Sequence, residues 1–480
     1  MSEVTEKIRA IIEEKRDAFF EISDQIWECP EIRFEETKSS AYSADFMEKE
    51  GFTVERGVAD IPTAFTATFG NKGPVIGILG EYDALPGLSQ KAGVTEYDPV
   101  ERDGHGHGCG HNLLGVGAMS AAVAVKEYLE KENIEGTVKY FGCPAEESGY
   151  AKTYMVKARL FDDVDAAFSW HPHYLNSLFN GPSLAVIHAT FTFKGKSSHA
   201  SASPELGRSA LDAVELMNIG ANYMREHMID EARVHYAVTN TGGKSPNVVQ
   251  RDAEVSYFVR APRAEQARSL FKRLTKIAEG AVLMTETEMT YKVEGACSNL
   301  VQNSVLDKLL HQNMNALETE RYTEEEVSKA KEYFNTLNDE DKNFAENLTG
   351  KTLAEVFKER PLVHETAPYR EAPEYAKGSG STDVGSVSWV VPTAQLVAAT
   401  WSFGTPFHTW QVVSQGTLSY AKKGMLYAGE SIASSVIDLF NNPEVIEDAK
   451  KELVEREAGP ENYKSLLPDE QYTAPILEEE

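Results

Sequence analysis

Short apolar runs alternate with helix-length periodic segments along the first 180 residues. The apolar runs, which predict buried strands, are VIGILG at 75–80, TVKYFGC at 137–143 and VDAAFSW at 164–170. A segment with helical periodicity, AMSAAVAVKEYLEKE at 118–132, lies between the first two runs. Strands that alternate with helices in this way are typical of an α/β layer with a largely parallel sheet.

The pattern changes near residue 184, where apolar and polar residues begin to alternate. The strand patterns are LAVIHATFTFKG, VHYAVTNTGG, AEVSYFVRAP and EMTYKVEG, and amphipathic helices are predicted near 207–227 and 263–284. Their order is strand, helix, strand, strand, helix, strand, which is typical of a compact α+β unit.

A helical pattern follows this unit, NSVLDKLLHQNMNALE, and suggests that the chain returns to its first domain. We therefore predict an α/β fold with a mostly parallel sheet in a discontinuous domain, 1–183 and 297–480, interrupted by an α+β domain at 184–296. The charged, helix-prone stretch at about 322–375 is predicted to be a surface insertion. The strand AQLVAATWSF at 394–403 completes the pattern.

Charge and composition exclude several classes of protein. The 75 acidic residues exceed the 47 basic ones, and the net charge of −28 opposes binding to nucleic acid or to an anionic membrane. No apolar run reaches the roughly eighteen residues of a membrane span, and the N-terminal pattern lacks the apolar centre of a signal peptide. Four scattered cysteines form no disulfide framework in a chain of this length. We expect a cytoplasmic protein without nucleic-acid or membrane partners, and an acidic C-terminal tail that is solvated.

The sharpest local signal is a glycine-rich stretch, HGHGCGHN at 105–112, followed by a helix-forming run. Glycines between the donors remove side-chain bulk, and alternate spacing turns Cys109 and His111 toward one point. Thiolate and imidazole are ordinary ligands of zinc and related divalent ions. His105 and His107 stay outside the predicted site, because a solvated loop explains them equally well.

Two adjacent carboxylates, Glu146 and Glu147, follow the predicted strand TVKYFGC. Adjacent glutamates are common on helices, but at the end of a strand their side chains diverge and serve two purposes. One carboxylate can bind a metal ion while the other accepts a proton from the attacking water.

Two histidines complete the set, His171 in WHPH and His408 in FGTPFHTW. Each histidine taken singly is more often structural than a ligand. However, all four motifs follow predicted strands, and sites assemble at the carboxyl ends of strands in open α/β sheets. Five donors are too many for one tetrahedral ion and suit two ions that share a water. The predicted metal ligands are Cys109, His111, Glu147, His171 and His408.

Segments spread over nearly the whole chain resemble the two-metal aminoacylase and carboxypeptidase family. They are DQIWECPEIRFEE, GEYDALPGLSQ, GHGCGHNLLG, FDDVDAAFSWHP, SPELGRSALDAV, ARVHYAVTNTGG, SPNVVQ, KIAEGAVLMTET, STDVGSVSW and GTPFHTWQVVSQG. The resemblance implies a metal-dependent amidohydrolase that holds two divalent ions, Mn²⁺ or Zn²⁺, and cleaves an N-acyl amino acid. The expected substrate is an N-acyl-glutamate such as p-aminobenzoyl-glutamate.

The resemblance assigns the five donors as metal ligands and Glu146 as the general base, which takes a proton from water and later hands it to the departing amine. The chain departs from the family pattern before Ala-Leu-Pro, where the better-known branch carries a ligand His two residues ahead of an Asp. These positions hold Glu81 and Asp83 here. Asp83 is expected to support the ligands from behind, and Glu81 is left outside the ligand set.

The inserted domain carries three further residues whose roles follow from the resemblance: His199, Asn247 and Arg260. The family uses this domain as a lid and for dimerisation, and its matching residues contact the scissile carbonyl and the terminal carboxylate of the substrate. The His often reaches into the site of the neighbouring subunit, where it stabilises the developing oxyanion. An Arg with an amide donor recognises a carboxylate through two hydrogen bonds. The expected assembly is a homodimer or a heteromer with a related second subunit.

Two alternative functions stay open. A dipeptidase or a broad aminoacylase uses the same scaffold and the same centre for other acyl groups and amino acids. A non-catalytic or dependent subunit of a heteromeric hydrolase is the alternative from another class, although Glu146 and all five donors are present. The sequence has no serine nucleophile elbow, phosphate-binding loop or dinucleotide fingerprint in the required context.

Overall fold

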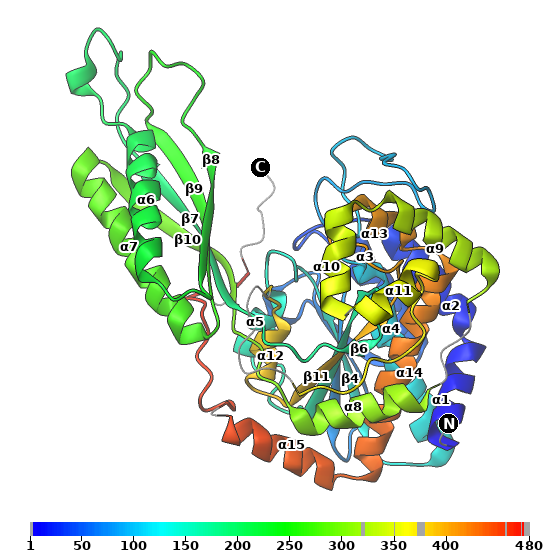
Figure 1. The fold of residues 1–480 in the computed structure, drawn as a ribbon. Coiled ribbons are helices and arrows are strands. Elements are labelled where there is room, and N and C mark those ends of the chain that lie inside the picture. The colour runs from blue at the N-terminus through cyan, green and yellow to red at the C-terminus, as the bar shows by residue number, and fades with distance from the viewer. Residues whose placement is uncertain are drawn as a thin grey trace.

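The computed structural model describes residues 3–317, 322–349, 351–371, 380–456, 458–471 and 473–474. Two β-sheets organise these residues into a larger and a smaller part (Figure 1). The last residues of the predicted insertion, 372–375, and the acidic end of the chain, 475–480, lie outside the described residues.

The larger part is built on a seven-stranded sheet with the order β1-β2-β4-β3-β5-β11-β6. Its four central strands, β4, β3, β5 and β11, run parallel, whereas the outer strands pair antiparallel. The strands are β1 (Thr53–Arg56), β2 (Phe65–Phe69), β3 (Val75–Glu81), β4 (Thr137–Cys143), β5 (Ala166–His173), β6 (Ser177–Leu178) and β11 (Thr393–Ala399). Because β11 comes from the far end of the chain, the chain returns to this sheet after the smaller part. The predicted mostly parallel α/β sheet is confirmed.

Helices cover both faces of this sheet, which explains why its central strands are continuous apolar runs. Side chains alternate along β3: Ile76 and Ile78 pack with α4 and α14, whereas Leu79 packs with α5 and α12 on the other face. The helices of the larger part, apart from the insertion, are α1 (Glu3–Glu14), α2 (Arg16–Trp27), α3 (Thr37–Lys49), α4 (His111–Glu132), α5 (Ala151–Lys157), α8 (Ser304–Ala316), α12 (Val384–Ser388), α13 (Trp410–Gln415), α14 (Ser419–Asn441) and α15 (Glu444–Glu455).

The smaller part is a four-stranded antiparallel sheet with the order β10-β7-β9-β8. Helices α6 and α7 cover its face that is turned away from the larger part (Figure 1). Buried positions alternate strictly along β9, as expected for a sheet with one covered face. Strand β8 forms one edge, and most of its side chains are exposed. The elements are β7 (Ala185–Lys194), α6 (Ala210–Met224), β8 (Arg233–Asn240), β9 (Asp252–Ala261), α7 (Ala264–Thr285) and β10 (Glu288–Cys297).

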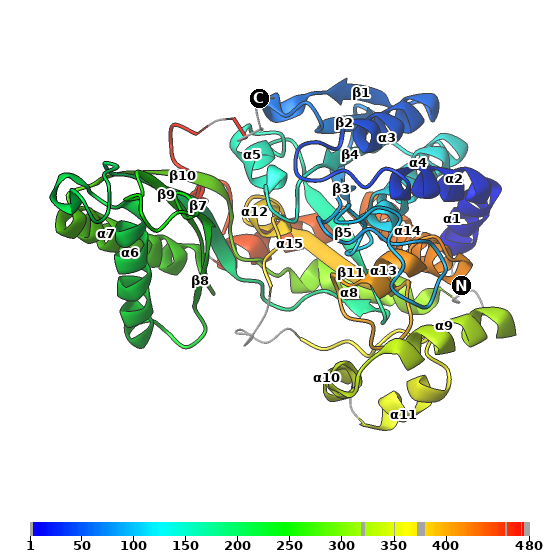
Figure 2. The same cartoon turned by 90° about the horizontal axis from the view of Figure 1, so that it is seen from above.

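The described part of the predicted insertion contains helices that lie on the outside of the larger part (Figure 2). They are α9 (Glu324–Thr336), α10 (Asp339–Thr349) and α11 (Lys351–Glu359). Phe334 of α9 and Phe357 of α11 pack in one apolar cluster with Trp401 and Phe403, which follow β11. The insertion therefore supports the loop between β11 and α13. No helix among the described residues combines the length and the apolar character needed to cross a bilayer.

Several boundaries differ from the sequence patterns. Helix α4 begins at His111, seven residues before the periodic segment that predicted it, because its first turns are buried on every side. Strand β5 continues through His173, so that His171 lies within the strand and not beyond it. Strands β1 and β2 were not predicted, because their short, partly exposed segments carry a weak apolar pattern.

Candidate metal centre

The parallel strands place the predicted donors at one edge of the larger sheet. Cys109 and His111 lie where the loop after β3 enters α4, and Glu146 and Glu147 lie in the turn after β4. His171 is near the carboxyl end of β5, and His408 lies in the loop after β11. These strands are neighbours in the order β4-β3-β5-β11, so their carboxyl ends converge.

Left-handed backbone positions shape the loops that carry the donors. Gly110 has φ 75° between Cys109 and His111, and a Cβ there would lie within 3.1 Å of Pro172 and Trp401. His408 itself has φ 59°, which is strained for a residue with a side chain. Its backbone N–H donates to the Gly108 carbonyl at 2.9 Å, which ties the His408 loop to the cysteine loop.

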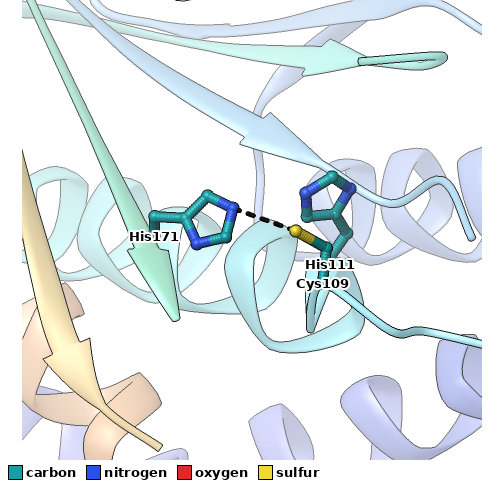
Figure 3. A group of neighbouring side chains, drawn as sticks. All are labelled: Cys109, His111 and His171. Atoms are coloured by element: carbon teal, nitrogen blue, oxygen red, sulfur yellow. Dashed lines mark hydrogen bonds between the residues drawn. The ribbon is translucent and has the colours of Figure 1, made fainter. Parts of the chain in front are cut away.

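Three overlapping groups of side chains bring ligand atoms within 4.8 Å of one another. Cys109, His111 and His171 form the first group, with Cys109 Sγ 3.4 Å from His171 Nε2 (Figure 3). The second group joins Cys109 to Glu147 and His408. The structure thus brings together all five donors that were predicted from the sequence.

In His111 and His171, the Nδ1 atom of the ring already makes a hydrogen bond. His111 Nδ1 donates to Asp83 Oδ1 at 2.8 Å, and His171 Nδ1 donates to the Pro172 carbonyl at 2.8 Å. Asp83 Oδ2 also accepts the backbone N–H of Glu147 at 3.0 Å. Partners of this kind fix the tautomer and leave the Nε2 lone pair free for a metal ion.

Two buried atoms in these groups make no hydrogen bond of good geometry: His111 Nε2 faces Glu81 Oε2 at 3.3 Å, and Glu147 Oε1 faces His408 Nε2 at 3.3 Å. Buried polar atoms are normally paired, because leaving one unpaired costs roughly 1–3 kcal/mol. Both atoms belong to donor groups, and Cys109 lies beside them. A divalent cation would satisfy both, so the residues fit a metal centre.

Burial and crowding of acidic groups disturb the protonation of the site. Burial raises the pKa of the Cys109 thiol well above its ordinary value, and the Glu147 carboxylate adds to this effect. Burial, together with the Glu81 carboxylate, likewise raises the pKa of Glu146.

Burial opposes protonation of His111, but the Asp83, Glu81 and Glu147 carboxylates together outweigh it and raise the pKa of His111 to about 10. At His171 burial prevails and lowers the pKa to about 4. Protons therefore balance much of the negative charge in the metal-free site. Metal binding releases such protons, because ligands bind in their deprotonated forms.

A third donor group and the cation behind it were not predicted from the sequence. Glu81, which was left outside the ligand set, ends β3 with Oε2 3.3 Å from His111 Nε2 and joins His111 and Glu146 in a group with ligand spacing. Lys152 Nζ lies 2.6 Å from Glu81 Oε1 and 2.6 Å from Asp383 Oδ1, and all three side chains are buried. Glu81 could have been predicted from the sequence, because it is a carboxylate at the end of a strand that is apolar along its length. No local signal marked Lys152 or Asp383.

The three residues predicted in the smaller part lie apart from this cluster. The His199 ring accepts from Asn247 Nδ2 at 3.3 Å, and both side chains are exposed. Arg260 donates from Nη1 to Ser381 Oγ at 2.7 Å, two residues before Asp383, and from Nε to His235 at 3.3 Å. The hydrogen bonds of the described residues link none of the three to the donors. His107, which was left outside the site, is buried and donates to the Ile26 carbonyl.

A parallel α/β sheet with clustered Cys, His and Glu donors at its carboxyl edge, joined to a separate α+β part, defines a metal-binding α/β enzyme. The pattern of Peptidase family M20/M25/M40 matches residues 77–338. One of the subunits of p-aminobenzoyl-glutamate hydrolase from Escherichia coli strain K12 is 46% identical over 459 residues, which are 94% of this chain and 95% of that protein. The chain therefore belongs to peptidase family M20/M25/M40 and is a metal-dependent amidohydrolase.

More distant relatives share the fold. A mouse Xaa-Arg dipeptidase is 28% identical over 92% of this chain and 90% of that protein. The structure of an aminobenzoyl-glutamate utilization protein from Klebsiella pneumoniae superposes with a TM-score of 0.61 at 17% identity, covering 90% of this chain and 98% of that one. A Bacillus subtilis protein described as a dinuclear metal-binding M20 peptidase superposes with a TM-score of 0.53 at 17% identity, covering 89% of this chain and 99% of that one.

Proposed function

We propose that this enzyme hydrolyses the amide bond of an N-acyl-glutamate, with p-aminobenzoyl-glutamate as the substrate and p-aminobenzoate and glutamate as the products. The observation that carries the proposal is the 46% identity to the E. coli hydrolase chain over almost the full length of both proteins. The converging donors add the chemistry that an amide hydrolase needs.

Cys109, His111, Glu147, His171 and His408 are the proposed ligands of two divalent ions, Mn²⁺ or Zn²⁺. Their soft sulfur and imidazole donors suit zinc, and the carboxylate also suits manganese. When bound, such ions polarise the amide carbonyl and acidify the attacking water. The Asp83 carboxylate holds the His111 ring in the orientation that this role requires.

Glu146 is the proposed general base. It is buried beside Glu147, and its pKa is raised, so that it holds a proton more readily than an exposed glutamate. It takes a proton from the attacking water and delivers it to the nitrogen of the leaving amine, so that the same carboxylate serves both halves of the reaction.

The smaller part supplies the proposed contacts to the rest of the substrate. We assign residues 184–296 as a lid and dimerisation domain between the two parts of the catalytic domain, 1–183 and 297–480. Arg260 and Asn247 bind the terminal carboxylate, and His199 stabilises the oxyanion. The hydrogen bond from Arg260 to Ser381 supports this assignment, because Ser381 precedes the segment that holds Asp383 beside the site.

The proposed assembly is a homodimer or a heteromer with a related second subunit, since the E. coli relative is named as one of the subunits of its enzyme. Strand β8 is an edge strand with exposed Tyr236 and Val238, which suits pairing between subunits. The proposed compartment is the cytoplasm, which fits four cysteines that are all free.

A dipeptidase is the second candidate, because the mouse Xaa-Arg dipeptidase matches this chain over 92% of its length. The two functions differ in the substrate that is cleaved and share the metal centre. Comparing hydrolysis of p-aminobenzoyl-glutamate with that of basic and neutral dipeptides separates them.

The first test is hydrolysis of p-aminobenzoyl-glutamate by metal-stripped protein, before and after Mn²⁺ or Zn²⁺ is added. We expect no glutamate release from stripped protein and release after metal addition. If the protein binds two ions but releases no glutamate, either alone or with a related second subunit, the substrate is wrong. If elemental analysis finds no bound metal after addition, the assignment of the centre fails.

A further inference from the structure

Two partly exposed phenylalanine side chains lie beside the donor cluster. Phe179 follows β6 and is 40% exposed, and Phe407 precedes His408 and is 39% exposed. Their ring centroids lie 6.3 Å and 5.4 Å from the ring of His171. The two residues are far apart in the sequence, yet both stand beside the same donor.

Neighbouring rings pack against the side chain of Phe407, and a hydrogen bond holds the backbone of Phe179. The Phe407 ring packs edge-on against buried Trp401, with centroids 5.6 Å apart at 88°, and lies 5.3 Å from the ring of His173. The backbone N–H of Phe179 donates to the Gln395 carbonyl at 2.9 Å, which ties Phe179 to β11. Such support holds an apolar surface in place before a ligand arrives and so lowers the cost of binding.

The two phenylalanines lie where the acyl group of an acylated amino acid would be bound. His171 Nε2 faces Cys109 Sγ, so the carbonyl that is to be cleaved belongs next to these atoms. In an aroyl amide the aromatic ring is bonded directly to that carbonyl carbon. The ring must therefore lie within a few ångströms of His171, where Phe179 and Phe407 stand. Aromatic rings pair favourably in edge-to-face or offset geometry, which a small aliphatic acyl group does not offer.

We propose that Phe179 and Phe407 form an aryl subsite that binds the aromatic ring of an N-aroyl amino acid. This inference rests on the proposed function and extends it, because it assigns the acyl-group selectivity to two particular side chains. The subsite selects neutral, flat acyl groups, since neither phenylalanine offers a charge or a hydrogen bond.

The test compares two substrates that differ only in the acyl group, p-aminobenzoyl-glutamate and acetyl-glutamate. The measured quantity is the ratio of their kcat/KM values. For Phe407→Ala and for Phe179→Ala we expect this ratio to fall about tenfold, mainly through the KM for the aroyl substrate. Phe407→Leu, which keeps the bulk but removes the ring, covers the case in which the alanine variant does not fold. Phe344→Ala is the matched control, because Phe344 is 70% exposed on α10 and belongs to none of the donor groups.

Calorimetric binding of p-aminobenzoyl-glutamate to Glu146→Gln protein, with and without Phe407→Leu, gives a second readout that does not require turnover. Weaker binding with the leucine supports the subsite, and equal binding overturns it. If the ratio of kcat/KM is unchanged in every phenylalanine variant, the subsite is overturned while the proposed function stands. If the wild-type protein cleaves neither substrate, the proposed function fails, and the calorimetric comparison alone decides the subsite.

Discussion

Lys152 is a buried cation held between two buried carboxylates, Glu81 and Asp383. Burial opposes its charge, but the Asp383 and Glu81 carboxylates outweigh that effect and raise the pKa of Lys152 well above its ordinary value. Glu81 in turn lies 3.3 Å from His111 Nε2, so this buried network reaches the candidate metal centre. Lys152 therefore holds a carboxylate in place beside the donors and keeps it ionised.

Replacing Lys152 with methionine removes the buried cation that lies between the two carboxylates, so that their negative charges are no longer balanced by the lysine. We expect Lys152→Met to lower the free energy of unfolding of the metal-free protein by about 3–5 kcal/mol, measured by urea denaturation. The matched control is Lys131→Met, whose surface ion pair with Glu127 is worth about 0–1 kcal/mol. Similar losses in the two variants would contradict a structural role for the buried network.

Glu146→Gln is a second test of a single residue, and it tests the assignment of Glu146 as the general base. The amide keeps the size of the side chain but does not accept the proton, so turnover should fall by roughly 10²–10⁴-fold. Elemental analysis should find an unchanged metal content, because Glu147 and the other four proposed ligands are intact. The control is Glu130→Gln on the exposed side of α4, which should keep full turnover. Undiminished turnover in Glu146→Gln would reject Glu146 as the base.

At the scale of single elements, helix α8 carries a buried carboxylate in its first turn. Glu452 of α15 accepts the backbone N–H groups of Ser304 and Val305, each at 3.0 Å, and so occupies the N-terminus of α8. Asp307 lies buried one turn later, where burial raises its pKa to about 7. The folded protein therefore holds a proton on Asp307 at pH values where the unfolded chain has released it.

This shift predicts a pH dependence with a definite sign. Between about pH 4 and pH 7 the folded state binds more protons than the unfolded state, so Asp307 makes the free energy of unfolding fall as the pH rises. Asp307→Asn removes this loss. Its melting temperature relative to the wild type should therefore be higher at pH 8 than at pH 4. The same substitution at exposed Asp230 should show no such trend. An identical offset at both pH values would show that the Asp307 carboxyl does not titrate in this range.

At the scale of the whole molecule, we propose that a second subunit supplies the contact of His199 with the substrate. His199 and Asn247 are exposed and bond to each other, whereas the donors lie at the edge of the other sheet. A dimer through the smaller parts would carry His199 of one protomer to the site of its partner.

Mixing two inactive variants tests this arrangement. His199→Ala and Glu146→Gln protein, unfolded together and refolded, should recover about a quarter of the wild-type activity, because half of the dimers are mixed and each mixed dimer has one intact site. Each variant refolded alone is the control. If the mixture stays inactive although sizing shows dimers, His199 does not act across the interface.

The types of residues and their order in the sequence were enough by themselves to predict strands of the larger sheet and the five donors. Apolar runs at 75–80 and 137–143 predicted buried parallel strands, because a strand covered on both faces has no polar side. Cys109 and His111 were recognisable from their glycine-rich spacing before a helix, whereas Glu147, His171 and His408 were recognisable because they lie at or beyond the carboxyl ends of strands, which meet in a parallel sheet.

Only the tertiary structure decided which other groups reach the centre. Lys152 and Asp383 are 231 residues apart, and Phe179 and Phe407 come from different loops, so no local pattern connects them. Their proximity depends on the chain returning through β11 to the sheet that it left after β6. Burial by surrounding elements then fixes their energetics, because a lysine or a carboxylate takes its ionisation state from its neighbours and not from its place in the sequence.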